Sequence, residues 1–126
     1  MIFSKISDGR TEVRLEINWR LPKGEVVRTY HKADDSSISV FTLSPEALFM
    51  EKLGAYSSRK LIRDVYDIYH LSNLVDAKKL DLVEVRKQFG TLPDPVDEKN
   101  LRTIVYSGAV PTFKQMVELL RARFST

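Results

Sequence analysis

The chain divides into two regions by the spacing of its hydrophobic residues. From Glu12 to Arg20, apolar residues occupy every odd position and polar or charged residues every even position. This period of two is typical of a half-buried strand. Pro22 and Gly24 then indicate a turn, and alternation returns twice before residue 44. The pattern predicts a three-stranded antiparallel meander over residues 12–20, 25–30 and 38–43.

From residue 44 onward the pattern becomes helical. Ser44 is a good N-cap, and Pro45 suits the first helical position, where its missing N–H costs nothing. This first helix is expected to end near Ser57. Strands followed by helices indicate one α+β domain over residues 1–126, with the sheet in 1–43 and helices on one face of it in 44–126. The later helices are predicted at about 60–74, 80–89, 98–106 and 113–124.

Composition narrows the functional classes without selecting one. The 126 residues carry a formal net charge of +3, which is too small to indicate a nucleic-acid binder by itself. There is no cysteine, which excludes disulfides and thiolate metal sites. No run of about 18 apolar residues and no signal peptide are visible, so we expect no membrane span and a cytoplasmic location.

Charged side chains flank the apolar stripes of the first two predicted helices. Lys52 and Arg59 are seven residues apart, so they project from nearly the same side if the first helix reaches Arg59. Asp64 and Asp67 are three apart, so they lie one turn from each other on the second helix. Two such carboxylates repel at neutral pH unless a cation stands between them. The candidates are Lys52, Arg59, Arg63 or a bound metal ion.

Two interpretations of this charged stretch remain open on the residues alone. In the first, Arg59 or Arg63 binds the aspartates, and the ion pairs clamp the two helices together. In the second, Lys52 and Arg59 hold the oxygens of a polyphosphate, and the aspartates orient them or act as a general base. Asp64 and Asp67 alone offer too few ligands for a metal site. His31 and His70 lie far apart in the sequence and are read as ordinary boundary histidines.

The same stretch resembles the later half of AbiEii/AbiGii-type nucleotidyltransferase-like toxins. The similarity covers roughly residues 10–90 and implies the later portion of a nucleotidyltransferase fold. Its motif consists of a Pro-Glu pair, a Lys-Leu-x-Ala segment, an arginine, and an Arg-Asp-x-x-Asp segment followed by a hydrophobic residue. In this chain these are Pro45-Glu46, Lys52-Leu53-Gly54-Ala55, Arg59, and Arg63-Asp64-Val65-Tyr66-Asp67-Ile68.

The resemblance implies transfer of a nucleoside monophosphate from an NTP, with Mg²⁺, to an acceptor, which is tRNA for some members. Such proteins act as toxins in toxin–antitoxin or phage-defence pairs, so an antitoxin protein is an implied partner. Lys52 and Arg59 would bind the nucleotide phosphates, and Asp64 would be a base or organise the site. The implied supporting residues are Arg63, Asp67 and Glu16, although the strand pattern favours a solvent-facing residue at Glu16.

One part of the family pattern is missing. No Gly-Ser or Gly-Thr turn is followed by Asp-x-Asp or Asp-x-Glu, the carboxylates that hold the metal ions in such enzymes. We therefore expect a truncated, split or degenerate domain that is inactive alone. The alternative is a non-catalytic RNA- or protein-binding module derived from the same fold. The small sheet also predicts an exposed strand edge that pairs with a second copy or a complementing chain.

Overall fold

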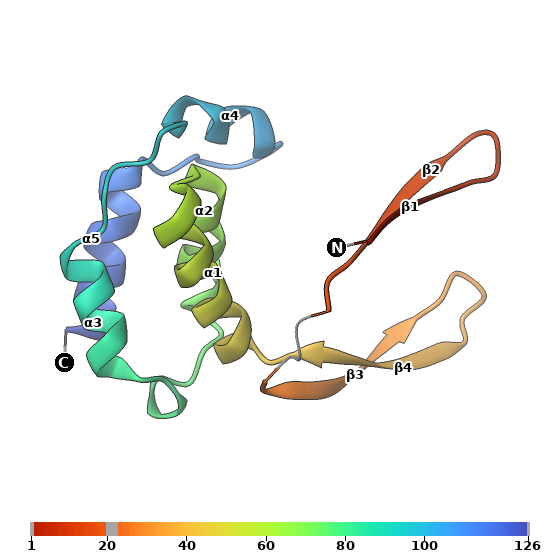
Figure 1. Cartoon of the computed structure of the whole chain (residues 1–126), viewed down its shortest axis with the longest axis horizontal. Helices are drawn as coiled ribbons and strands as arrows, with labels where there is room; N and C mark the ends of the chain where they lie inside the picture. Colours follow the sequence, from red (N-terminus) through yellow and green to blue (C-terminus); the bar gives the residue numbers. More distant parts are fainter. Residues whose placement is uncertain (1, 20–22, 126) are drawn as a thin grey trace.

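A computed structural model describes residues 2–19 and 23–125, and Figure 1 shows two β-hairpins that extend from a body of helices. The order of strands followed by helices confirms the predicted α+β class. The strands are β1 (Ile2–Ser7), β2 (Glu12–Ile17), β3 (Glu25–His31) and β4 (Ser37–Leu43). The helices are α1 (Pro45–Arg59), α2 (Ile62–Leu71), α3 (Leu82–Gly90), α4 (Leu101–Ile104) and α5 (Phe113–Phe124), with 3₁₀ turns at Ala77–Lys79 and Glu98–Asn100.

The strands form two separate antiparallel hairpins, so the predicted three-stranded meander is wrong. Among the described residues, β2 pairs with β1 and β3 pairs with β4. The first strand was missed because its alternation is short and mixed. Asp8 closes the first hairpin by accepting hydrogen bonds from the N–H groups of Arg10 (2.9 Å) and Thr11 (2.7 Å), and Gly9 takes a positive φ of 86°. Of the turn predicted over residues 21–24, positions 21 and 22 lie outside the described residues.

The second hairpin leads directly into the helical body. Ser44 follows β4, donates its N–H to the carbonyl of Gly24 (2.8 Å) and accepts a hydrogen bond from the N–H of Ala47 at its side chain (3.2 Å). The predicted N-cap at Ser44 is therefore confirmed. Gly24 has a φ of 81°, and a Cβ there would come within 3.1 Å of the Ala47 side chain. This close approach fixes the start of α1 beside the base of β3.

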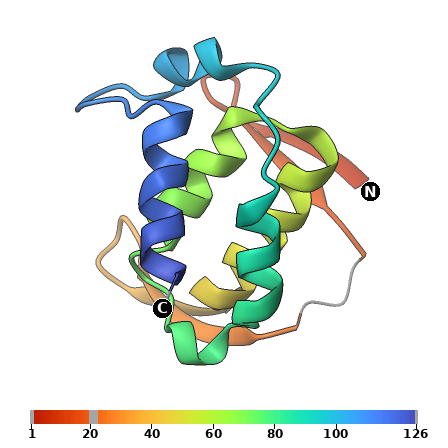
Figure 2. The same ribbon diagram turned by 90° about the vertical axis from the view of Figure 1, so that its left-hand side faces the viewer.

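The hydrophobic core lies among the helices and not beneath a sheet, which corrects the expectation of helices packed on one sheet face. Figure 2 shows α1, α2, α3 and α5 side by side around this core. Phe49, Phe89 and Phe124 join three of these helices, with ring centroids 5.4 to 6.2 Å apart. The predicted stripe of α1, formed by Phe49, Leu53 and Tyr56, is buried as expected. None of the described helices is long and apolar enough to cross a membrane.

The connector between α3 and α4 crosses the junction of α1 and α2. The hydroxyl of Tyr56 donates to the carbonyl of Pro93 (2.6 Å), and the N–H of Val96 donates to the carbonyl of Lys60 (3.0 Å). The Asp97 carboxylate accepts a hydrogen bond from the N–H of Ile62 (2.7 Å). These three bonds attach a segment distant in sequence to the turn that positions the charged residues of α1 and α2.

Candidate functional site

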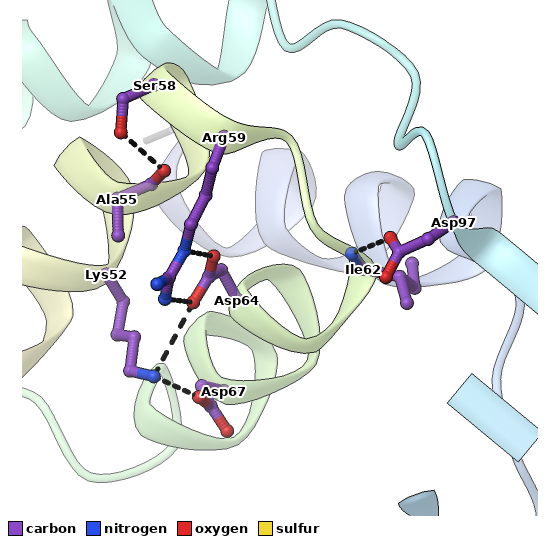
Figure 3. A network of polar contacts seen from close by, with 8 residues as sticks. All are labelled: Lys52, Ala55, Ser58, Arg59, Ile62, Asp64, Asp67 and Asp97. Carbon is purple, nitrogen blue, oxygen red and sulfur yellow. Dashed lines mark hydrogen bonds and ion pairs between the residues drawn. The ribbon is translucent and has the colours of Figure 1, made fainter. Parts of the chain in front are cut away.

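Four of the predicted site residues meet between α1 and α2 (Figure 3). Asp64 accepts two hydrogen bonds from Arg59, from Nε to Oδ2 at 2.7 Å and from Nη2 to Oδ1 at 2.6 Å. The Nζ atom of Lys52 lies 3.5 Å from the Oδ1 atom of Asp64 and also donates to Asp67. We call Lys52, Arg59, Asp64 and Asp67 the charged cluster.

The turn after α1 brings these residues together. Lys60 adopts a left-handed conformation (φ 54°), and its N–H bonds to the carbonyl of Tyr56 at 2.8 Å, which ends the helix. The chain reverses through Leu61 and starts α2 at once. Arg59 in the last turn of α1 therefore lies next to Asp64 in the first turn of α2. Both positions also suit the helix dipoles, which favour a cation at a C-terminus and an anion at an N-terminus.

Burial differs sharply across the charged cluster. Asp64 has 0% of its surface exposed, whereas the side chains of Arg59, Lys52 and Asp67 are 43%, 31% and 42% exposed. Burial by itself would raise the pKa of Asp64, but the hydrogen bonds and positive charge of Arg59, with those of Lys52, outweigh it and lower that pKa. The hydrogen bond to Asp64 raises the pKa of Arg59. Both groups are therefore ionised at neutral pH.

The geometry limits what each member of the charged cluster can do. Both oxygens of Asp64 are occupied by Arg59, and the group is inaccessible to solvent with a lowered pKa. These properties suit a carboxylate that positions cations, and they do not suit a general base. Arg59 donates to Asp64 through Nε and Nη2. A guanidinium has five N–H donors, so Arg59 keeps others for a further partner. Arg59 and Lys52 can thus offer donors to an anion from the outside.

The charged cluster does not fit a metal ion. Asp64 and Asp67 are its two carboxylates, and each already faces a cation. Within residues 2–19 and 23–125, no three histidine or acidic side chains gather in a way that could hold a metal. Mg²⁺ prefers octahedral oxygen ligands, which this pair of engaged carboxylates does not supply.

Two predicted site residues lie outside the charged cluster. Arg63 is exposed on α2 and has no hydrogen-bond or ion-pair partner among the described residues. Glu16 lies on β2 and forms an ion pair with Arg14 (3.1 Å), on the hairpin that stands away from α1 and α2 in Figure 1. His70 packs its ring against Tyr66, with centroids 4.4 Å apart, and His31 belongs to β3.

Asp97 supports the site, and the sequence pattern did not reveal this role. Its position just before the helix predicted at about 98–106 indicates a start signal for that helix. Instead its side chain caps α2, whose own N-cap residue, Leu61, provides no side-chain hydrogen bond. The residue it caps is 35 positions away in the sequence, so no local spacing could have indicated the contact. Figure 3 shows Asp97 at the opposite end of the first turn of α2 from the charged cluster.

Comparison with known protein families identifies the family of this chain. Residues 2–119 match the family described as nucleotidyl transferase AbiEii toxin, type IV TA system, where TA stands for toxin–antitoxin. The match extends beyond the residues 10–90 expected from the motif and includes both hairpins and the charged cluster. No curated protein and no solved structure matches the chain. The chain therefore belongs to the AbiEii nucleotidyl transferase toxin family of type IV toxin–antitoxin systems.

Proposed function

We propose that α1 and α2 provide the phosphate-binding face of an AbiEii-type nucleotidyl transfer site. Lys52 and Arg59 bind phosphate oxygens of an NTP, and Asp64 positions both cations. The observation that supports this most is the buried Asp64 carboxylate, which orients the Arg59 guanidinium from one side and leaves its remaining donors free to bind. Arginine recognises phosphate well because its donors form a planar fork.

The remaining residues take supporting roles in this proposal. Asp67 holds the Lys52 ammonium when no nucleotide is present and releases it to an incoming phosphate. Arg63 lies on the exposed side of α2 and can meet the nucleotide or an RNA acceptor. Glu16 is left out of the phosphate-binding face because its ion pair is with Arg14 on β2.

In the proposed reaction, an acceptor hydroxyl loses its proton to solvent and its oxygen attacks the α-phosphorus of the NTP. The bond between the α-phosphorus and the oxygen bridging to the β-phosphorus breaks, and pyrophosphate leaves. Negative charge spreads over the phosphate oxygens during this step, so two fixed cations stabilise it. Mg²⁺ would supply further charge neutralisation if ligands outside the charged cluster held it. The charged cluster cannot hold it, so we propose that this chain alone does not catalyse transfer. A tRNA acceptor and an antitoxin protein are the partners that the family suggests.

A second candidate is a non-catalytic module that binds RNA or protein. The observation that favours it is the mutual pairing within the charged cluster, where two cations and two carboxylates balance. Such a cluster can serve purely to hold α1 against α2. In that case the exposed Arg63 and the hairpins would carry the binding.

The experiment that separates these candidates uses the purified chain, labelled NTPs, Mg²⁺ and a pool of tRNA. We expect the chain to retain NTP and to transfer no label to RNA. Label transfer by the chain alone would contradict the proposed lack of independent catalysis. Retention of RNA without any retention of NTP would favour the non-catalytic module.

A further inference from the structure

The β1–β2 hairpin has an apolar face that no other described element covers. The pairs Ile2↔Ile17, Ser4↔Leu15 and Ile6↔Val13 place their side chains on one face, and the opposite face is mainly charged. The apolar residues of the first face are 38% to 61% exposed, and every residue of both strands is exposed. Figure 1 shows the hairpin extending away from the helices.

An isolated hairpin of this kind lacks what a sheet needs for stability in water. Two strands are marginal alone, and three or more strands with a hydrophobic face are generally required. Each strand of the hairpin also has a free edge of N–H and C=O groups that can pair with another strand. The hairpin would therefore gain stability from an added strand, and its free edges offer the backbone groups to bind one.

The charges along β2 are self-complementary. Arg14 and Glu16 alternate with apolar residues, and they already attract each other along the strand at 3.1 Å. Across the hairpin, Arg14 faces Lys5, which is an unfavourable pairing of like charges, while Lys5 forms its ion pair with Glu12 at 2.8 Å. A strand that brings a carboxylate opposite Arg14 on its other side would improve this arrangement.

We propose that a second copy of this chain pairs antiparallel with β2 along its free edge. In the register that places Leu15 opposite Leu15 of the second copy, Arg14 lies opposite Glu16, and Glu16 lies opposite Arg14. The same register sets Val13 against Ile17 on the apolar face. The contact is isologous, so each favourable charge pair forms twice.

The residues of β2 also disfavour the neighbouring registers of this strand pairing. Centring the pairing on Arg14 would oppose Arg14 to Arg14 and Glu12 to Glu16, which repel. A shift by one residue would turn the apolar side chains of one copy to the charged face of the other. In the second hairpin, β4 gives no comparable signal, because it carries no charged residue that could fix a register.

The resulting sheet has four strands in the order β1-β2-β2-β1. The apolar residues of the two β2 strands then become cross-strand neighbours on one continuous apolar face, which lowers their exposure. This dimer does not depend on the proposed phosphate site. Loss of nucleotide binding would leave it intact, and loss of the dimer would leave the charged cluster intact.

Single-cysteine variants test both the dimer and its register, since the chain has no native cysteine. Leu15→Cys places two thiols opposite each other across the two-fold axis, and we expect it to form a disulfide-linked dimer under mild oxidation. Val13→Cys is the matched control on the same face of β2. Its thiols would lie opposite Ile17 and far from each other, so we expect no efficient cross-link.

Sedimentation equilibrium of the full chain measures self-association directly. We expect a mass that rises with concentration from 14.5 kDa towards twice that value. Arg14→Glu should weaken association about tenfold or more, because it opposes like charges twice, although it puts a carboxylate opposite Lys5 and so preserves the hairpin. Adding Glu16→Arg to the same chain should restore association.

Two outcomes would overturn the proposal. One is a strictly monomeric chain at all concentrations, which would point to a different protein as the occupant of this edge. The other is equal cross-linking of Leu15→Cys and Val13→Cys, which would mean that the copies meet without the proposed register.

Discussion

The Arg59 guanidinium binds the Asp64 carboxylate through two parallel hydrogen bonds of 2.7 and 2.6 Å, and Asp64 is fully buried. The pair joins the last turn of α1 to the first turn of α2. It therefore fixes the angle at which the two helices leave their shared turn. It also determines where Lys52, 3.5 Å from the same carboxylate, can place its ammonium group.

Removal of the Arg59 side chain tests how much the Arg59–Asp64 ion pair contributes to the stability of the fold. Arg59→Met keeps the aliphatic packing but leaves a buried carboxylate with only Lys52 nearby. We expect the free energy of unfolding to fall by about 3 kcal/mol, the lower end for breaking a buried ion pair, because Lys52 partly compensates. Urea unfolding followed by far-UV circular dichroism measures this loss. Arg63→Met is the matched control on α2, and an equal effect of both variants would contradict a special role for Arg59.

Acid should weaken the contact between α1 and α2 through Asp64. Its pKa is lower in the folded chain than in the unfolded one, so its stabilisation is present above the ordinary carboxyl pKa of about 4. It is lost as the pH falls through the lowered value. The stability difference between the wild type and Asp64→Asn should be largest at neutral pH and shrink below about pH 4. A difference that does not vary with pH would show that the ionised carboxylate adds nothing.

The hydroxyl of Tyr56 should ionise at a higher pH than that of an exposed tyrosine. Burial, followed by the nearby charges of Asp94, Asp97 and Glu98, raises its pKa to about 12. Because the folded pKa exceeds the unfolded one, its stabilisation is complete below pH 10 and is lost as the pH rises through 12. Tyrosinate absorbance at alkaline pH reports this ionisation.

Tyr56→Phe should remove the part of the absorbance change that occurs near pH 12. It should also cost about 1–2 kcal/mol, because the carbonyl of Pro93 loses its donor. A wild-type titration without any absorbance change near pH 12 would contradict the proposed environment of Tyr56.

The cap that Asp97 provides to α2 predicts a clear contrast between two substitutions. Asp97→Ala should lower the free energy of unfolding by about 1 kcal/mol, the usual cost of a lost helix N-cap. Asp97→Asn should keep most of the stability, because an asparagine oxygen also accepts from the N–H of Ile62. Thermal unfolding of both variants measures the contrast, and identical losses would mean that the negative charge matters and not the cap.

Local signals predicted the helical region well. Ser44 and Pro45 mark the start of α1. At the start of α5, which is close to the predicted position, Thr112 and Gln115 form a reciprocal pair of capping hydrogen bonds. The buried stripe of α1 follows from a period of 3.6. Each of these features depends on residues within one or two turns, which is why the sequence alone was sufficient to find them.

The strand pairing could not be predicted in the same way. The period of two in β2 shows which side chains share a face, but it does not identify the neighbouring strand. The short strand β1, and not β3, pairs with β2, because the turn at Asp8 and Gly9 closes a hairpin before the chain reaches residue 23. The complete burial of Asp64 and the cap from Asp97 depend on tertiary contacts for the same reason.

Nucleotide affinity is the most direct test of the proposed phosphate-binding face. The measurement is equilibrium binding of each NTP, with and without Mg²⁺, to the wild type, Lys52→Met and the surface control Lys87→Met, with circular dichroism to confirm that each is folded. Loss of one charged contact to phosphate costs about 1.5–3 kcal/mol, so we predict at least tenfold weaker binding for Lys52→Met and no change for Lys87→Met. Equal affinity of these two variants, or no binding of any NTP by the folded wild type, would contradict the proposal.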